Sequence, residues 1–148
     1  MKTNGEFDAP DLETYLYTLV HSWSKTVTTL GFSLVPLFFI LDVFMMPGEL
    51  LSRFAVYRGV TTAIVVGQYF VLRATLPSKR DYLHGYFFTV IVGLMIVLMT
   101  TDLGGFNSTY YAGLNLVLIA VNLTLPWEFI HSVVNSLLIV GLYFAFRK

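Results

Sequence analysis

Two side chains of opposite charge lie inside apolar stretches of the sequence. Asp42 and Arg58 fall within segments that otherwise have the composition of membrane spans, and Gln68 follows nearer the middle of the second segment. Lipid cannot satisfy a charge or an amide, so each of these groups needs a partner. An ion pair between Asp42 and Arg58 is the simplest expectation. The alternative is a pocket for a charged ligand, and Gln68 fits either interpretation.

Three asparagines form a second group of polar residues in apolar surroundings. Asn115 and Asn122 are two helical turns apart and share one helix face, and Asn135 lies midway along the next apolar stretch. The sequence predicts that these amides are internal. They would either fix helix packing through interhelical hydrogen bonds or line a cavity for a ligand with polar and apolar parts.

Histidine suggests a different chemistry, because imidazole is a good ligand for haem iron and for zinc. A b-type haem in a helix bundle needs two histidines on facing helices, and His84 with His131 are the possible pair. His21 is expected on the water-facing side of an amphipathic surface helix formed by residues 11–24. Glu128 and His131 have a spacing known from di-iron sites, but such sites need a second copy and further carboxylates. An interfacial role is the simpler interpretation of these histidines.

Other chemistries find no support in the sequence. It has no Gly-rich phosphate loop, no H-E-x-x-H and no nucleophile elbow, so we expect no catalysis by this chain. It has no cysteine, which excludes disulfides and thiolate ligands. The net charge is zero, and no basic field suggests nucleic acid. Asn107 begins an N-S-T glycosylation pattern, which matters only in a eukaryotic secretory context.

The elements that must position these residues are membrane spans. Hydrophobic residues make up 56% of the 148 residues, charged residues only 12%, and the mean hydropathy is +0.72. A soluble domain is about one quarter charged. We therefore predict an all-α, polytopic bundle over residues 11–148. Its five spans are expected at 26–46, 54–74, 82–101, 109–126 and 128–146, separated by short turn-forming links.

The segment before the first span has its own pattern. Residues 1–10 are polar and are expected to form a flexible tail. Residues 11–24, DLETYLYTLVHSWS, place apolar side chains on one helix face and Glu13, Tyr17 and His21 on the other. This favours an amphipathic helix lying on the membrane surface. The alternative is that the segment extends the first span into water.

Basic residues predict the orientation. Arg73, Lys79 and Arg80 cluster around the link between the second and third spans, which places that link and the N-terminus in the cytoplasm. Five spans then leave the C-terminus outside, although the chain ends in Arg147 and Lys148. We therefore expect a further span after Lys148.

The order of these features resembles a known kind of module. The stretch YYAGLNLVLIAVNLTLPW, residues 110–127, enters a span with a tyrosine pair, a glycine and an asparagine and ends in Pro-Trp. The arrangement SRFAVYRGV…VLRATLPSKRDYLHGYF, within residues 52–88, adds an arginine-containing span followed by a Leu-Pro-basic link. Both are similar to the six-span membrane anchors and sensors of bacterial class III adenylate cyclases and sensor histidine kinases.

The resemblance implies a function. Six spans precede a cytoplasmic catalytic domain in that family, whereas this chain has five and no effector. It implies a sensor or anchor in the bacterial inner membrane that works as a homodimer and passes a helix movement to a cytoplasmic effector such as an adenylate cyclase or a histidine kinase. We expect that movement to depend on the state of the membrane or on a ligand that is lipid-like or small and amphiphilic. Spans containing Gly31, Gly59, Gly67, Gly93 and Gly113 are expected to pack closely. The alternatives are a haem-binding redox protein and a structural subunit of a larger membrane complex.

Overall fold

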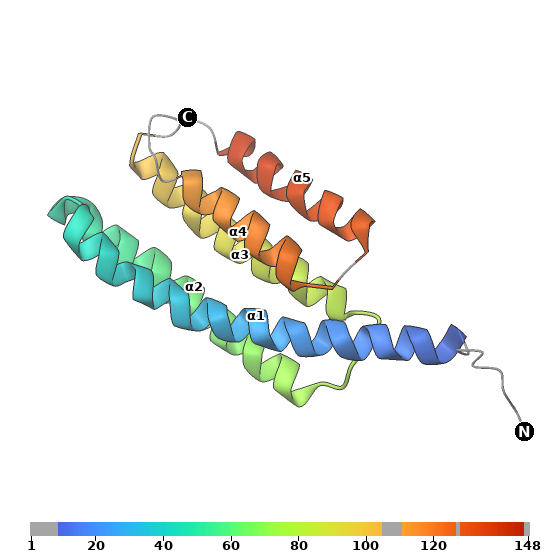
Figure 1. Ribbon diagram of the computed structural model, residues 1–148. Coiled ribbons are helices and arrows are strands. Elements are labelled where there is room, and N and C mark those ends of the chain that lie inside the picture. The colour runs from blue at the N-terminus through green and yellow to red at the C-terminus, as the bar shows by residue number, and fades with distance from the viewer. Residues whose placement is uncertain (1–8, 105–110, 127, 147–148) are drawn as a thin grey trace, which may run out of the picture.

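The structure, a computed structural model, describes residues 9–104, 111–126 and 128–146, and all regular elements in these ranges are α-helices. The all-α prediction is thus confirmed. In chain order the helices are α1 (Ala9–Met45), α2 (Gly48–Ala74), α3 (Asp81–Asp102), α4 (Tyr111–Thr124) and α5 (Phe129–Ala145), as Figure 1 shows.

Three of these helices are long and apolar enough to cross a membrane, namely α1, α2 and α3. The other two are apolar but shorter. Helices α4 and α5 extend about 21 and 26 Å at about 1.5 Å per residue. The hydrocarbon core of a bilayer is about 30 Å thick. The chain is thus a membrane protein with three helices of spanning length, and a fourth and fifth crossing remain a proposal.

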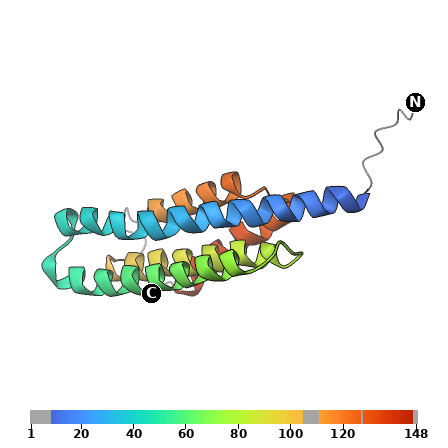
Figure 2. The same ribbon diagram turned by 90° about the horizontal axis from the view of Figure 1, so that it is seen from below.

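The helices are arranged around α3. Helices α1 and α2 form an antiparallel pair joined by a tight link at Pro47, and α4 and α5 lie on the other side of α3 (Figures 1 and 2). Helix α3 contacts each of the other four. It therefore carries much of the core, including Phe88, Val92 and Met99. Direct contact between α1 and α4 is sparse.

Helix α1 is one continuous helix of 37 residues, so the prediction of a separate surface helix at residues 11–24 was wrong. The alternative, an extension of the first span, is what the structure has. Nothing between Asp11 and Val35 breaks the helix, and the hydroxyls of Thr26, Thr28 and Thr29 each donate to the carbonyl four residues earlier. The expected tail lies mostly outside the described residues, but its last two residues, Ala9 and Pro10, are helical.

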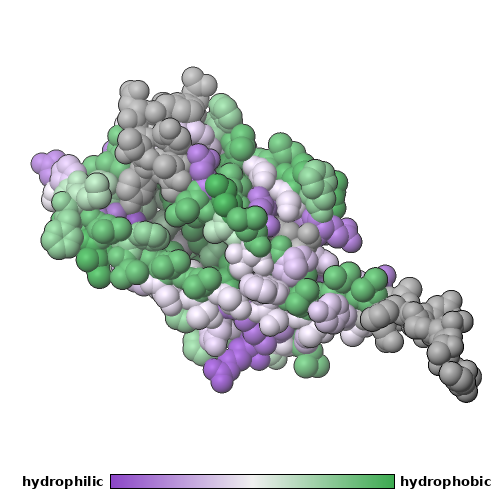
Figure 3. All heavy atoms as spheres, in the orientation of Figure 1, coloured by the Kyte–Doolittle hydropathy of each residue, from purple (hydrophilic) through white to green (hydrophobic). Residues whose placement is uncertain are grey.

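The molecule buries polar groups and exposes apolar ones. Large apolar side chains such as Phe44, Leu37 and Leu137 are more than half exposed. On the face in Figure 3, hydrophobic residues cover the C-terminal half of α1, whereas its N-terminal half is paler and more polar. Buried polar side chains include His21, Ser24, Thr28, Asp42, Arg58, Thr61, Gln68, Asp81, Thr89, Thr100 and Asn135. So many exposed apolar side chains need apolar surroundings, which the bilayer provides.

Glycine permits close packing at two of the predicted positions. A Cβ on Gly31 would lie 2.4 Å from the Phe88 ring, and one on Gly93 would lie 2.9 Å from Ile139 Cδ1. Gly31 thus lets α1 approach α3, and Gly93 lets α5 approach α3. Gly59 and Gly67 face open space, so neither brings two helices of this chain together. The surroundings of Gly113 lie outside what the structure describes.

Candidate functional site

The predicted ion pair between Asp42 and Arg58 is present and buried. Arg58 Nε and Nη2 donate to the two carboxylate oxygens of Asp42, the second at 3.1 Å. Arg58 Nη1 also donates to the carbonyl of Val35 at 3.1 Å, and its guanidinium lies 6.0 Å from the Phe38 ring centroid. Only 2% of Asp42 and 6% of Arg58 is exposed. The pair joins α1 to α2 in a fork-to-fork geometry that Lys cannot provide.

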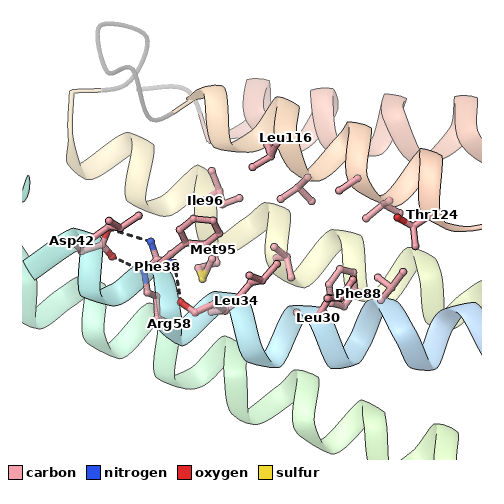
Figure 4. A pocket seen from close by; sticks show the side chains of 18 of the residues that line it. Leu30, Leu34, Phe38, Asp42, Arg58, Phe88, Met95, Ile96, Leu116 and Thr124 are labelled. Carbon is pink, nitrogen blue, oxygen red and sulfur yellow. Dashed lines mark hydrogen bonds and ion pairs between the residues drawn. The ribbon is translucent and has the colours of Figure 1, made fainter.

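A groove begins at this ion pair and runs along α1. It has a volume of about 380 Å³ and lies between α1 and α4, with α3 as its floor (Figure 4). The described residues of its walls are apolar apart from Asp42, Arg58 and Thr124. The principal lining residues are Val27, Leu30, Leu34, Phe38, Phe88, Met95, Leu116 and Val121.

The other predicted ligand-binding residues do not join this groove. Gln68 is buried, and its Nε2 donates to the carbonyl of His84 at 2.6 Å, so it links α2 to α3. It lies ten residues beyond Arg58, about 15 Å along α2. Asn115, Asn122 and Asn135 do not line the groove either. The residues that were predicted to bind ligands therefore lie at separate places in the structure.

The three asparagines have different surroundings. Asn115 is exposed in the single chain, so the prediction that it is internal was wrong. Asn122 is half-buried, and its Nδ2 donates to Ser136 Oγ at 3.1 Å, which ties α4 to α5. Asn135 is fully buried in α5, and neither atom of its amide has a hydrogen-bond partner among the described residues. Only Asn122 thus makes the interhelical bond that was predicted.

His84 and His131 do not face each other. The His131 ring stacks on Tyr82 of α3 at a centroid distance of 4.5 Å, and its Nδ1 lies 2.6 Å from the hydroxyl of Tyr86. His84 lies two residues from each of these tyrosines, about 200° around the helix, so it occupies the opposite face of α3. A haem between these histidines does not fit this geometry.

Glu128 and His131 provide no di-iron site either. Glu128 is exposed, and the described residues contain no group of three or more His, Cys, Asp or Glu side chains placed to hold a metal.

His21 forms a buried contact that the sequence did not reveal. It was predicted on the wet side of a surface helix, but it is 4% exposed, and its Nδ1 lies 2.9 Å from Asp81 Oδ2 at the start of α3. The same Asp81 oxygen accepts from the backbone N–H of Ser78 at 2.9 Å. The contact therefore anchors the N-terminal part of α1 to the link between α2 and α3. A partner 60 residues away left no local signal.

Polar groups thus join different helices at two levels. Asp42 and Arg58 connect α1 to α2 near one end of the bundle, and His21 and Asp81 connect α1 to α3 near the other.

Comparisons with protein-family models, with curated proteins and with solved structures find no match for this chain. Its function must therefore be inferred from its own geometry.

Proposed function

We propose that this chain is a membrane sensor or anchor module of a bacterial signalling protein. It passes a helix movement to a cytoplasmic effector such as an adenylate cyclase or a histidine kinase, and it catalyses no reaction itself. The observation that carries the proposal is the buried Asp42–Arg58 pair between two helices whose outer faces are apolar. Buried charges in membrane spans are costly, and they are usually retained for function.

The pair suits a switch between two helix arrangements. A sensor needs two states separated by a few kcal/mol, and a ligand shifts their populations only through a difference in affinity. Movement of α1 along α2 would exchange the contacts of Arg58 with Asp42 and with the Val35 carbonyl. An amphiphilic ligand bound in the apolar groove beside the pair would favour one arrangement.

Basic residues support an orientation in the bacterial inner membrane. Arg73, Lys79 and Arg80 lie around the α2–α3 link, at the bundle end where the N-terminal part of α1 also lies (Figure 1). Lys79 reaches Glu13 of α1 at 3.7 Å. Excess Lys and Arg mark the cytoplasmic side, so we place this end and the N-terminus in the cytoplasm.

We further propose that the module is a homodimer that pairs through α2. Gly59, Ala63 and Gly67 are exposed at four-residue spacing, which is the small-xxx-small pattern of closely packed spans. A Cβ on either glycine would meet nothing within 4 Å in this chain. Gly59→Leu with Gly67→Leu should therefore abolish energy transfer between labelled copies in proteoliposomes without unfolding the monomer. Val140→Leu on α5 is the control, and transfer that survives the double change would exclude this interface.

The function is tested with the natural product of the gene. The protein as its host expresses it, with any catalytic domain that it contains or binds, is reconstituted and assayed for cyclic AMP formation or autophosphorylation. Asp42→Asn should change the output about fivefold or more, the usual lower range of allosteric coupling. Val140→Ala, on an exposed face, should leave it unchanged. A product that neither contains nor binds a catalytic domain would overturn the proposal.

A further inference from the structure

The groove between α1 and α4 is long and narrow. Residues of α1 line the groove at about every third or fourth position from Val27 to Met45, a stretch of about 27 Å of helix. Side chains of α3 and α4 face this part of α1 across the groove, which has a volume of about 380 Å³. A flat ring system such as haem would not use the length. The shape suits one extended chain.

The groove walls require that chain to be hydrocarbon. Among the described residues that line it, Asp42, Arg58 and Thr124 are the polar ones. Asp42 and Arg58 neutralise each other, so the wall offers no net charge for an ionic head group. Water does not fill the remaining length either, because apolar cavities without polar partners stay dry. An acyl chain satisfies the walls, and it would also shield the ion pair from water, which strengthens its hydrogen bonds.

The groove opens sideways toward the lipid. Leu30, Leu34, Leu41 and Leu116 line it and are each 41% or more exposed, so its rim lies on the outer surface of the bundle. A chain can therefore enter from the membrane without crossing water. At the Met45 end the groove reaches the last turn of α1, where a lipid head group can remain at the membrane surface.

We propose that the groove is the binding site for one acyl chain of a bilayer phospholipid, from the leaflet on the Met45 side. The binding of the lipid does not depend on the proposed function. Its role as the signal by which the sensor responds to the state of the membrane rests on that function. The chain lies along α1 from the Asp42–Arg58 pair toward Val27. A thinner or differently composed leaflet fills the groove differently, and α1 then changes its packing against α4.

The test uses proteoliposomes containing a phosphatidylglycerol with a mid-chain diazirine, irradiated and mapped by mass spectrometry. Val35, Val92 and Val121 line the groove and are at most 5% exposed, so surrounding lipid cannot reach them. Leu137, exposed on α5, reports that surrounding lipid. The proposal expects label at the three buried valines as well as at Leu137. Label at Leu137 alone would overturn it.

Filling the groove provides the matched variants. Ala120→Phe and Leu34→Trp each place a ring in the groove and should lower the valine label about fivefold or more, because an overpacked site rejects its occupant. Leu37→Trp and Val140→Phe, on exposed faces outside the groove, should leave it unchanged. Unchanged label in both groove variants would contradict the proposal.

Two further arms distinguish other occupants. Label at the three valines from a diazirine palmitate, with none from the diazirine phosphatidylglycerol, would show that a free amphiphile occupies the groove in place of the phospholipid. The chain has no cysteine, so Ala120→Cys is a clean probe. A disulfide between two such chains would show that a second copy covers the groove, and either result would overturn the proposal. The labelling needs no effector, so its failure is distinct from failure of the proposed signalling function.

Discussion

At the scale of single residues, the Asp42–Arg58 pair is the feature that the sequence predicted best. These are the only charged residues well inside the predicted spans, and a charge in lipid needs a counter-charge. The carbonyl of Val35 as a further acceptor could not be predicted, because it depends on how α1 and α2 rotate against each other.

Breaking this pair should be costly, whereas replacing it should not. Arg58→Leu alone leaves Asp42 buried without its guanidinium and should lower the free energy of unfolding by about 3–5 kcal/mol. Asp42→Leu should cost a similar amount, and the double variant should recover most of the loss. Steric-trapping unfolding in bicelles measures all four proteins. Singles as stable as the wild type would show that the two charges are not buried together.

Asn135 should behave in the opposite way. Its amide is fully buried, and its nitrogen and oxygen have no partner among the described residues. An unsatisfied buried polar group costs about 1–3 kcal/mol, so Asn135→Leu should leave the unfolding free energy unchanged or raise it.

Asn122→Leu is the matched control for this change. It removes the bond to Ser136 and should cost about 0.6 kcal/mol in the same unfolding assay. A strong loss of stability in Asn135→Leu would reveal a partner that this single chain does not contain.

At the scale of helices, the sequence located the apolar cores of the elements but not all of their ends. The third span was predicted at 82–101, and α3 runs from Asp81 to Asp102. Helix α2 begins at Gly48, six residues before the predicted 54, because hydropathy finds the lipid-embedded part while the helix itself starts after Pro47. The groove could not be predicted, since it depends on the gap between α1 and α4.

The N-terminal part of α1 depends on the buried contact between His21 and Asp81. His21→Leu should remove the link to α3, so the amides of residues 12–24 should exchange hydrogen faster while those of residues 30–45 remain protected. Hydrogen–deuterium exchange in nanodiscs measures both segments. Thr18→Ala, which loses only a bond within α1, is the control. Equal exchange in His21→Leu and the wild type would contradict this role.

The two classes of glycine should also differ. Gly31→Ala brings a methyl group against the Phe88 ring and should cost about 1–3 kcal/mol of stability. Gly67→Ala meets open space and should leave the stability of the monomer unchanged or slightly higher. The same unfolding assay compares them. A tolerated Gly31→Ala would show that α1 and α3 are less closely packed than described.

At the scale of the whole molecule, the distribution of charged residues and apolar surface indicates a membrane protein. Apart from Lys25, Asp42 and Arg58, the charged side chains that the structure describes lie toward the ends of the helices, while apolar side chains cover much of the surface between them. Composition alone predicted a membrane protein. It did not predict that His21 faces the protein while Leu12 and Tyr15 face outward, because the pattern of residues 11–24 also fits a helix lying on the membrane.

Cysteine accessibility in sealed membrane vesicles tests most directly whether α1 crosses the bilayer. The chain has no cysteine of its own, so single cysteines can be introduced without a background signal. Single cysteines at Tyr15, Leu37 and Phe44 are all highly exposed in the isolated chain. In membranes, a polar maleimide should label Tyr15→Cys only from the cytoplasmic side, Phe44→Cys only from the opposite side, and Leu37→Cys from neither until detergent and denaturant are added. Rapid labelling of Leu37→Cys in intact vesicles, or labelling of Tyr15→Cys and Phe44→Cys from the same side, would contradict a bundle in which α1 crosses the bilayer.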